Sequence, residues 1–299
     1  MDSNTINISL SATTKRRAWQ VKEPVDKTDP TAHESFSIKK INGHSWILGA
    51  SIRGKKHAHQ GKFREDIFEF DCEAGFKIMA VADGAGSFSL SRVGGDIAVK
   101  KSVEFVKSYL CSLSQILGAE LACVDSSTIE DCLEQAGIKA IKAIKCEAEK
   151  RNTDPKQFST TLILAVAWLT GSGQKVSALQ VGDGLIVMSK SRCPVTIIGE
   201  QDRGRYISQS KFLTSQGIVS TLRSRIVTIP VEGQGIIAIM TDGIADDIYP
   251  PRKDLENFSK SMNQILINEE NPMAVVKKWI RYEKKGSYDD RTIIVYCFK

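Results

Sequence analysis

The chain has 299 residues, 41% of them hydrophobic, and it carries 41 basic against 35 acidic residues, a formal net charge of +6. This composition is typical of a globular protein with a sizeable core, and so small a basic excess argues against nucleic acid as a partner. No stretch reaches the ~20 apolar residues of a membrane span, so we expect no membrane association. Seven cysteines without a C-x-x-C pair and a polar stretch at residues 1–10 indicate free thiols, no signal peptide and a cytoplasmic location.

Residues 1–43 are interpreted as a polar N-terminal extension. They are rich in Ser, Thr, Lys and Asp, contain Pro24 and Pro30, and show little hydrophobic periodicity. We therefore expect a partly disordered segment, and the pattern leaves open whether it contributes one edge strand. The remaining residues, 44–299, are predicted to form a single domain.

Within this domain the hydrophobic pattern predicts blocks of strands and blocks of helices. Three strands come first, at residues 46–52, 67–70 and 76–82. Two amphipathic helices follow at residues 94–110 and 127–150, because apolar residues recur there at helical spacing. The later elements are six strands at 159–169, 175–181, 185–189, 195–198, 226–229 and 236–241, two helices at 255–267 and 272–283, and a last strand at 292–298.

Strands and helices thus occur in separate blocks and do not alternate. This order favours the α+β class, with two packed, mostly antiparallel β-sheets flanked by helices. Two polar segments interrupt it. Residues 53–64 are interpreted as a loop, and residues 201–225 as a flap or insertion near a functional site.

Acidic residues stand at the ends of four of the predicted strands. Asp83 and Asp242 each follow an apolar run and precede a glycine, Asp183 lies between two glycines, and Asp289 and Asp290 precede the last strand. Carboxylates that gather in space repel one another unless a cation neutralises them, and Mg²⁺ and Mn²⁺ prefer oxygen ligands. We therefore expect one acidic cluster that binds a hard divalent cation.

Six short motifs follow one another along the chain. They are ED at 65–66, DGAGS at 83–87, STT at 159–161, VGDG at 181–184, TDGIAD at 241–246 and DDRT at 289–292. One Asp-Gly pair alone is typical of a turn, but the six in this order resemble the protein phosphatase 2C family, in particular its bacterial branch. The resemblance spans roughly residues 45–299. It implies a sandwich of two sheets between helices, and metal-dependent hydrolysis of phosphoserine and phosphothreonine in proteins by an activated water, without a covalent intermediate.

The resemblance also implies roles for individual residues. Asp83 would bridge two metal ions, and Gly84 would bind one of them through its carbonyl group. Asp242 and Asp289 would complete the binuclear centre, so Asp83, Asp242 and Asp289 are the predicted catalytic residues. The other predicted ligands are Asp66, Glu65 through a water, and Asp183 and Asp246 at an additional, weaker site. The implied cofactor is Mg²⁺ or Mn²⁺, with two or three ions per site.

Two positions depart from the family pattern. Many eukaryotic members have a histidine directly after the first Asp-Gly, proposed as the general acid, whereas this chain has Ala85. Water or a histidine from residues 53–64 would then protonate the leaving group. Members also commonly carry a phosphate-binding arginine five residues before the ED aspartate, where this chain has Gly61. The candidates that replace it are Arg53, His57, His59, Lys62 and Arg64, and the sequence does not choose among them.

Three functions compete at this stage. The first is an active serine/threonine protein phosphatase, which we expect to be a monomer. Its partners would be a phosphoprotein substrate and a cognate serine/threonine kinase or its targets. The second is a catalytically silent phosphatase-like binding module, and the complete set of Asp83, Asp242 and Asp289 argues against it. The third is a hydrolase of small phosphoesters that uses the same metals.

Overall fold

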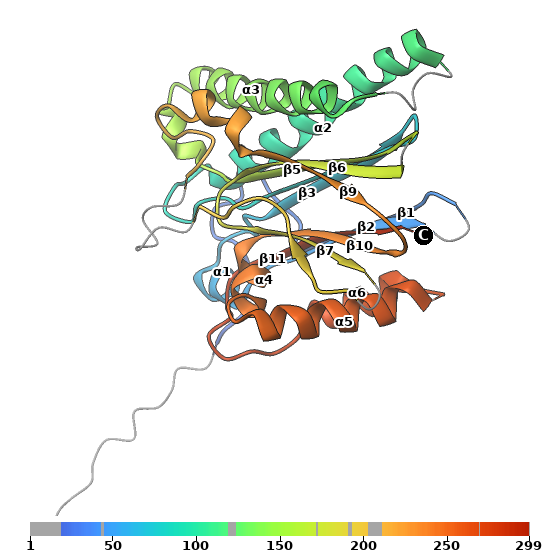
Figure 1. Ribbon diagram of the computed structural model, residues 1–299. Coiled ribbons are helices and arrows are strands. Elements are labelled where there is room, and N and C mark those ends of the chain that lie inside the picture. Colours follow the sequence, from blue (N-terminus) through green and yellow to red (C-terminus); the bar gives the residue numbers. More distant parts are fainter. Residues whose placement is uncertain are drawn as a thin grey trace, which may run out of the picture.

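The computed structural model describes residues 19–42, 45–118, 124–171, 173–190, 193–202, 211–268 and 270–298. The described chain forms four layers, with a five-stranded and a six-stranded sheet packed face to face between two groups of helices (Figure 1). Every pairing between neighbouring strands is antiparallel. The predicted fold class is therefore confirmed.

Each sheet takes its strands from distant parts of the sequence. In spatial order the six-stranded sheet contains β1 (Glu34–Lys40), β2 (Trp46–Ile52), β11 (Arg291–Phe298), β10 (Gly235–Met240), β7 (Leu185–Lys190) and β8 (Thr196–Ile197). The five-stranded sheet contains β3 (Ile67–Glu73), β4 (Phe76–Ala82), β5 (Leu162–Thr170), β6 (Gly173–Val181) and β9 (Ile226–Val231). The edge strand that the sequence left open is β1, which pairs with β2 along its whole length.

Three hydrophobic clusters hold the layers together. The residues of β11 alternate between two of them, because successive side chains of a strand point to opposite faces of the sheet. Ile293 and Val295 face the helices below the six-stranded sheet, whereas Ile294 and Tyr296 face the other sheet. The third cluster lies between the five-stranded sheet and the helices that cover it.

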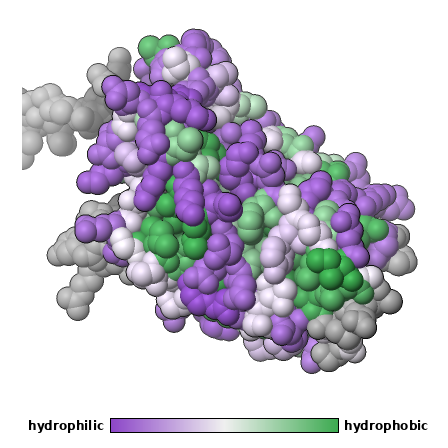
Figure 2. All heavy atoms as spheres, turned by 90° about the horizontal axis from the view of Figure 1, so that it is seen from above, coloured by the Kyte–Doolittle hydropathy of each residue, from purple (hydrophilic) through white to green (hydrophobic). Residues whose placement is uncertain are grey.

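The helices on the five-stranded sheet are α2 (Ser91–Leu117) and α3 (Ser126–Lys150). The side chain of Asp125 caps α3 by accepting the N–H of Thr128 at 2.9 Å, which satisfies one of the free donors at the start of the helix. Figure 2 views the molecule from this side and shows a mostly hydrophilic surface with separate hydrophobic areas. Both helices thus bury their apolar residues against the sheet, as their amphipathic pattern predicts.

Four further helices are shorter or lie on the other sheet. They are α1 (Lys55–Gln60), α4 (Asp242–Ile248), α5 (Arg252–Asn268) and α6 (Pro272–Trp279). The sequence did not predict α1 or α4, because each is only one to two turns long and carries too few apolar residues to show a helical period. None of the helices in the described ranges combines the length and the apolar character needed to cross a bilayer.

The part of the N-terminal extension that the structure describes is joined to the domain by backbone hydrogen bonds. Lys22 donates its N–H to the carbonyl of Ala58, and Val25 donates to the carbonyl of Gly61, both at 2.9 Å. These bonds place residues 19–25 along α1. A polar segment can therefore be ordered without a hydrophobic pattern, since its backbone groups find partners on the domain.

Candidate active site

Carboxylates from different strand ends meet at one end of the sandwich. Asp83 follows β4, Asp183 lies between β6 and β7, and Asp242 begins α4 directly after β10. One carboxylate oxygen from each of these three residues lies within 4.8 Å of the others. Three of the four expected strand ends thus form one cluster, whereas Asp289 and Asp290 group with His57. We use the name acid cluster for Asp83, Asp183 and Asp242.

The backbone beside the acid cluster is fixed by the Ser-Thr-Thr stretch. Asp83 donates its N–H to Thr161 Oγ1 at 2.8 Å, and its carbonyl accepts from Thr160 Oγ1 and from the Thr161 N–H, both at 2.9 Å. Gly84 continues this pairing as an isolated bridge to Thr160. The stretch therefore holds the Asp83 turn in place.

A glycine lets α4 approach the segment before β11. A Cβ atom at Gly243 would lie 1.8 Å from the carbonyl oxygen of Asp290, a distance that no side chain can occupy. Asp242 is thereby held next to the Asp289–Asp290 segment. The Asp-Gly order at 242–243 is a packing requirement as well as a family motif.

Burial and neighbouring negative charges disfavour the charged forms of Asp83 and Asp242. The pKa of Asp83 is raised well above its ordinary value, first by burial and then by the charges of Asp242, Asp66, Asp289 and Asp183. Burial also raises the pKa of Asp242, and there too the strongest neighbouring charges are carboxylates. Because the acid cluster consists of carboxylates alone, none of its members neutralises the negative charge of another.

Asp66 lies beneath the acid cluster and is 1% exposed. It accepts a hydrogen bond from Thr241 Oγ1 at 2.6 Å, and burial followed by the charge of Asp290 raises its pKa to about 7. Its neighbour Glu65 is also buried, which raises its pKa, and accepts from Ser91 Oγ at 3.1 Å. Both residues of the predicted pair, Glu65 and Asp66, are therefore buried and hydrogen-bonded.

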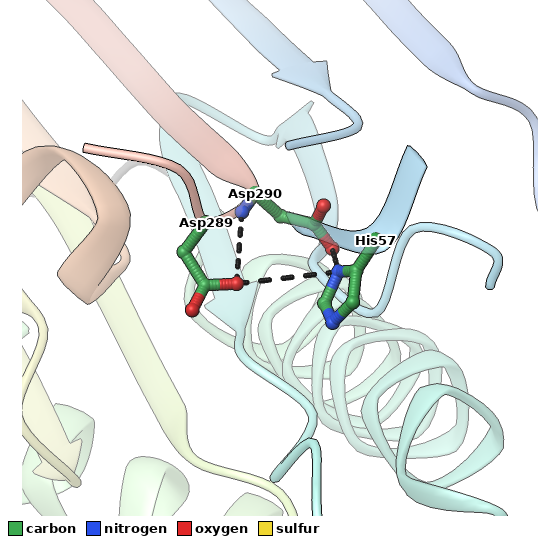
Figure 3. Close-up of side chains that lie close together, drawn as sticks. All are labelled: His57, Asp289 and Asp290. Carbon is green, nitrogen blue, oxygen red and sulfur yellow. Dashed lines mark hydrogen bonds and ion pairs between the residues drawn. The ribbon is translucent and has the colours of Figure 1, made fainter. Parts of the chain in front are cut away.

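Asp290 is a buried carboxylate of a different kind. It accepts the N–H groups of Gly54 and Glu65, each at 2.6 Å, and forms an ion pair with His57, whose Nδ1 lies 2.9 Å from Oδ2. Figure 3 shows His57 turned toward Asp290, with Asp289 beside them and its Oδ1 4.0 Å from the same nitrogen. Burial disfavours the charge of Asp290, but His57 and the two N–H groups outweigh it and lower the pKa of Asp290 below its ordinary value.

Helix α1 brings a lysine to the mouth of the site. Lys56 Nζ lies 3.0 Å from Asp289 Oδ2, and its N–H donates to the carbonyl of Tyr288 at 2.8 Å. Burial alone would lower the pKa of Lys56, but the bond to Asp289 and the charges of Asp242 and Asp83 raise it. Lys56 was not predicted from the sequence, because it lies near the acidic residues only through the folding of α1.

Of the five candidates for phosphate binding, His59 accepts a hydrogen bond from the Gln20 N–H at 3.2 Å, and the other four separate into two groups. Lys62 lies near the site, with Nζ 3.0 Å from the Gly86 carbonyl, and His57 lies there too but is 3% exposed. Arg53 donates to the carbonyls of Lys22 and His57. Arg64 is buried and donates to the carbonyl of Ala32. The two guanidinium groups thus bind backbone, mostly of the N-terminal segment, and the structure does not bring them to the acid cluster.

Asp246, the last of the predicted ligands, is exposed on α4 one turn after Asp242, and its charge contributes to the raised pKa of Asp242. The acid cluster offers three carboxylate oxygens within 4.8 Å of one another. Such a set fits Mg²⁺ or Mn²⁺, which prefer oxygen ligands and would neutralise the repulsion.

Clustered aspartates at the strand ends of a two-sheet sandwich could hold divalent cations of the kind that assist hydrolysis of phosphate esters. A family model of protein phosphatase 2C matches residues 53–281. The chain belongs to the protein phosphatase 2C family. No curated protein matches its sequence.

Solved structures of bacterial phosphatases share the fold. A bacterial serine phosphatase is 14% identical, with a TM-score of 0.56 over 85% of this chain and 97% of that chain. RsbX in complex with magnesium is 15% identical, with a TM-score of 0.51 over 89% of this chain and 100% of that chain. The catalytic domain of the serine threonine protein phosphatase PstP with 2 manganese ions is 14% identical, with a TM-score of 0.52 over 88% and 99%. The predicted family, fold and phosphatase class are confirmed.

Proposed function

We propose that the protein hydrolyses phosphoserine and phosphothreonine in proteins with the help of Mg²⁺ or Mn²⁺, by an activated water and without a covalent intermediate. The observation that carries the proposal is the acid cluster, whose three carboxylates approach within 4.8 Å in a chain of the protein phosphatase 2C family. Neighbours of the same fold contain magnesium or manganese. We further propose a cytoplasmic monomer with a catalytic domain at 44–299 and a polar extension at 1–43, acting against a serine/threonine kinase or on its targets.

Asp83, Asp242 and Asp289 would hold the metal ions, two or three in number. The remaining ligands would be the Gly84 carbonyl, Asp66, Glu65 through a water, Asp183 and Asp246. Bound there, the ions would lower the pKa of a water and offset the charge of the phosphate group. The burial of Asp83 and Asp242, which disfavours their charges in the free protein, supports this assignment.

The cationic side chains at the mouth would bind the phosphate oxygens. We assign this role to Lys56, with Lys62 as a second contact, because both side chains are partly exposed and lie beside the acidic residues. An ammonium group binds phosphate as a point charge, without the paired contacts of a guanidinium group. Arg53 and Arg64 receive no such role, since hydrogen bonds to backbone carbonyls hold each of them away from the acid cluster.

His57 is assigned a positioning role. Its side chain is too deeply buried to contact a phosphoprotein, and its ion pair with Asp290 ties α1 to the segment that carries Asp289. With Ala85 after the first Asp-Gly pair, protonation of the leaving group is left to water.

The test is phosphate release from a phosphothreonine peptide in EDTA, Mg²⁺ or Mn²⁺. We expect release that requires the metal and is lost in Asp242→Asn. The control is Asp254→Asn, which removes an exposed carboxylate of α5 and should keep wild-type activity. A folded protein that releases no phosphate with either metal would contradict the proposal and favour the silent binding module.

The same assay separates the third candidate function. A phosphopeptide and a small aryl phosphate are compared at equal concentrations. We expect a higher kcat/KM for the phosphopeptide, because a protein substrate also contacts the surface around the site. A preference for the small ester would favour a hydrolase of small phosphoesters.

A further inference from the structure

A cavity of about 360 Å³ lies next to the candidate active site, on the other side of α1. Its walls come from the ends of β1 and β2, from α1, and from the segment between α6 and β11. Asp289 belongs to this wall as well as to the proposed metal site. A peptide whose phosphorylated residue occupies the site could therefore reach the cavity with a neighbouring side chain.

The wall of the cavity carries more positive than negative charge once Asp289 is assigned to the metal. Its basic residues are Arg53, Lys55, Arg281 and Arg291, and its other acidic residues are Glu34 and Glu283. Four cations stand against these two carboxylates, and Asp247, which pairs with Arg291 from outside the wall, reduces the excess to one positive charge. An anionic group fits such a cavity better than a neutral or cationic one.

Of these cations, Arg53 forms no ion pair with a described carboxylate, whereas Arg291 pairs with a buried one, with Nη2 3.8 Å from Asp247 Oδ2. Arg53 binds the carbonyls of Lys22 and His57, and Arg291 binds those of Ile280 and Tyr282. The Nε atoms of both arginines are buried, and neither finds a hydrogen-bond partner among the residues that the structure describes. Arg291 is 8% exposed, so its charge acts through a medium that screens it weakly.

The other two cations lie at the entrance and are held only by exposed ion pairs. Arg281 Nη2 lies 2.6 Å from Glu34 Oε2, and Lys55 pairs with Glu283. All four side chains of these pairs are about half exposed or more. Such pairs are weak, so an incoming carboxylate can compete for the two cations.

We propose that this cavity is a substrate subsite for an acidic side chain, the carboxylate of an Asp or Glu that flanks the phosphorylated residue. The inference rests on the proposed phosphatase function and adds a preference to it. Arg53 supplies the fixed positive charge at the wall, and Lys55 and Arg281 guide the carboxylate at the entrance.

The experiment compares phosphothreonine peptides that carry Glu, Gln or Lys at each position flanking the phosphothreonine. We expect the Glu peptide to exceed the Lys peptide in kcat/KM by about tenfold at one or two adjacent positions, with Gln between them. In the double variant Lys55→Glu, Arg281→Glu the ratio of Glu to Lys peptide should invert. The matched control is Lys142→Glu, Lys150→Glu, which makes the same charge change on α3 at the opposite face of the sandwich and should keep the wild-type ratio (Figure 1).

Hydrolysis of all the peptides at equal rates would overturn the subsite and leave the phosphatase function intact. An unchanged ratio in the double variant would do the same. Binding of the peptides to Asp242→Asn, followed by fluorescence anisotropy, tests the subsite without turnover. There the Glu peptide should bind more tightly than the Lys peptide, and equal binding would refute the subsite even if no peptide is hydrolysed.

Discussion

The candidate active site contains two kinds of carboxylate, the partly buried acid cluster and the fully buried Asp290, and their pKa values shift in opposite directions. In the acid cluster, burial and neighbouring carboxylates raise the pKa of Asp83 and Asp242. At Asp290, two backbone N–H groups and His57 lower the pKa in spite of complete burial. The comparison distinguishes carboxylates that need a cation from outside from one whose charge the fold itself neutralises.

The same comparison separates ligands from positioning residues. A carboxylate already bound by two N–H groups and an imidazole has little capacity left for a metal ion, whereas the acid cluster has unused oxygen atoms close together. Asp290 and His57 thus fix the positions of α1, Glu65 and Asp289, whereas the acid cluster is available to bind a cation. Four predictions test this distinction.

The largest effect is expected from Asp242→Asn or Asp83→Asn. Each removes a carboxylate that a metal would need, and metal stabilisation of transition-state charge contributes several kcal/mol, so we expect activity to fall on the order of a thousandfold. Each variant also removes a repelling charge, so the metal-free protein should be at least as stable as the wild type. Urea denaturation in EDTA measures this, and a clear loss of stability would contradict the role of the acid cluster.

The second prediction concerns the neutralised carboxylate. His57→Ala leaves Asp290 charged and buried without its partner, and breaking such a pair costs about 3 kcal/mol of unfolding free energy. Urea denaturation of the metal-free protein measures the loss. Introducing His57→Ala into an Asp290→Ala background should cost clearly less, and equal costs in the two backgrounds would show that the two residues do not act as a pair.

The third prediction is the pH dependence of stability without metal. The folded-state pKa of Asp66 is raised from its ordinary 3.8 to about 7, so the folded state binds more protons than the unfolded state between these values. This contribution to stability is complete below pH ~4 and is lost as the pH rises toward ~7. Asp83 and Asp242 shift in the same direction. Thermal unfolding at several pH values should show the loss in EDTA and a smaller loss with Mn²⁺, and an identical profile in both would argue against metal binding there.

The smallest effect is expected from Lys56→Met. Loss of one exposed cation that binds phosphate should lower kcat/KM for a phosphothreonine peptide by about tenfold, mainly through KM. Lys101→Met is the control, since Lys101 is exposed on α2 and pairs with Glu104. Equal kinetics in the two variants would remove Lys56 from the phosphate site.

Much of the fold was predictable because its strands and long helices carry strong periodic patterns. The predicted strand at 76–82 coincides with β4, and the predicted helix at 127–150 differs from α3 by one residue. The short helix α1 was not predictable in this way. Its sequence, KKHAHQ, has almost no apolar residue, and it is held by contacts with the distant segment Tyr288–Asp290.

The acidic residues of the site were predictable from their places at strand ends, whereas their partners were not. His57 and Asp290 are 233 residues apart in number, and nothing local to either indicates that they form an ion pair. Lys56 went unnoticed for the same reason. Arg53 and Arg64 were predicted by residue type, but each donates a hydrogen bond to a backbone carbonyl of the N-terminal segment, which no local pattern indicates.

The most direct measurement is a calorimetric titration of the metal-free protein with Mn²⁺. The account predicts binding by the wild type, loss of at least one bound ion in Asp242→Asn, and binding by Asp254→Asn equal to the wild type. Absence of binding by the folded wild type, or equal binding by Asp242→Asn, would contradict the claim that the acid cluster is neutralised by a metal ion.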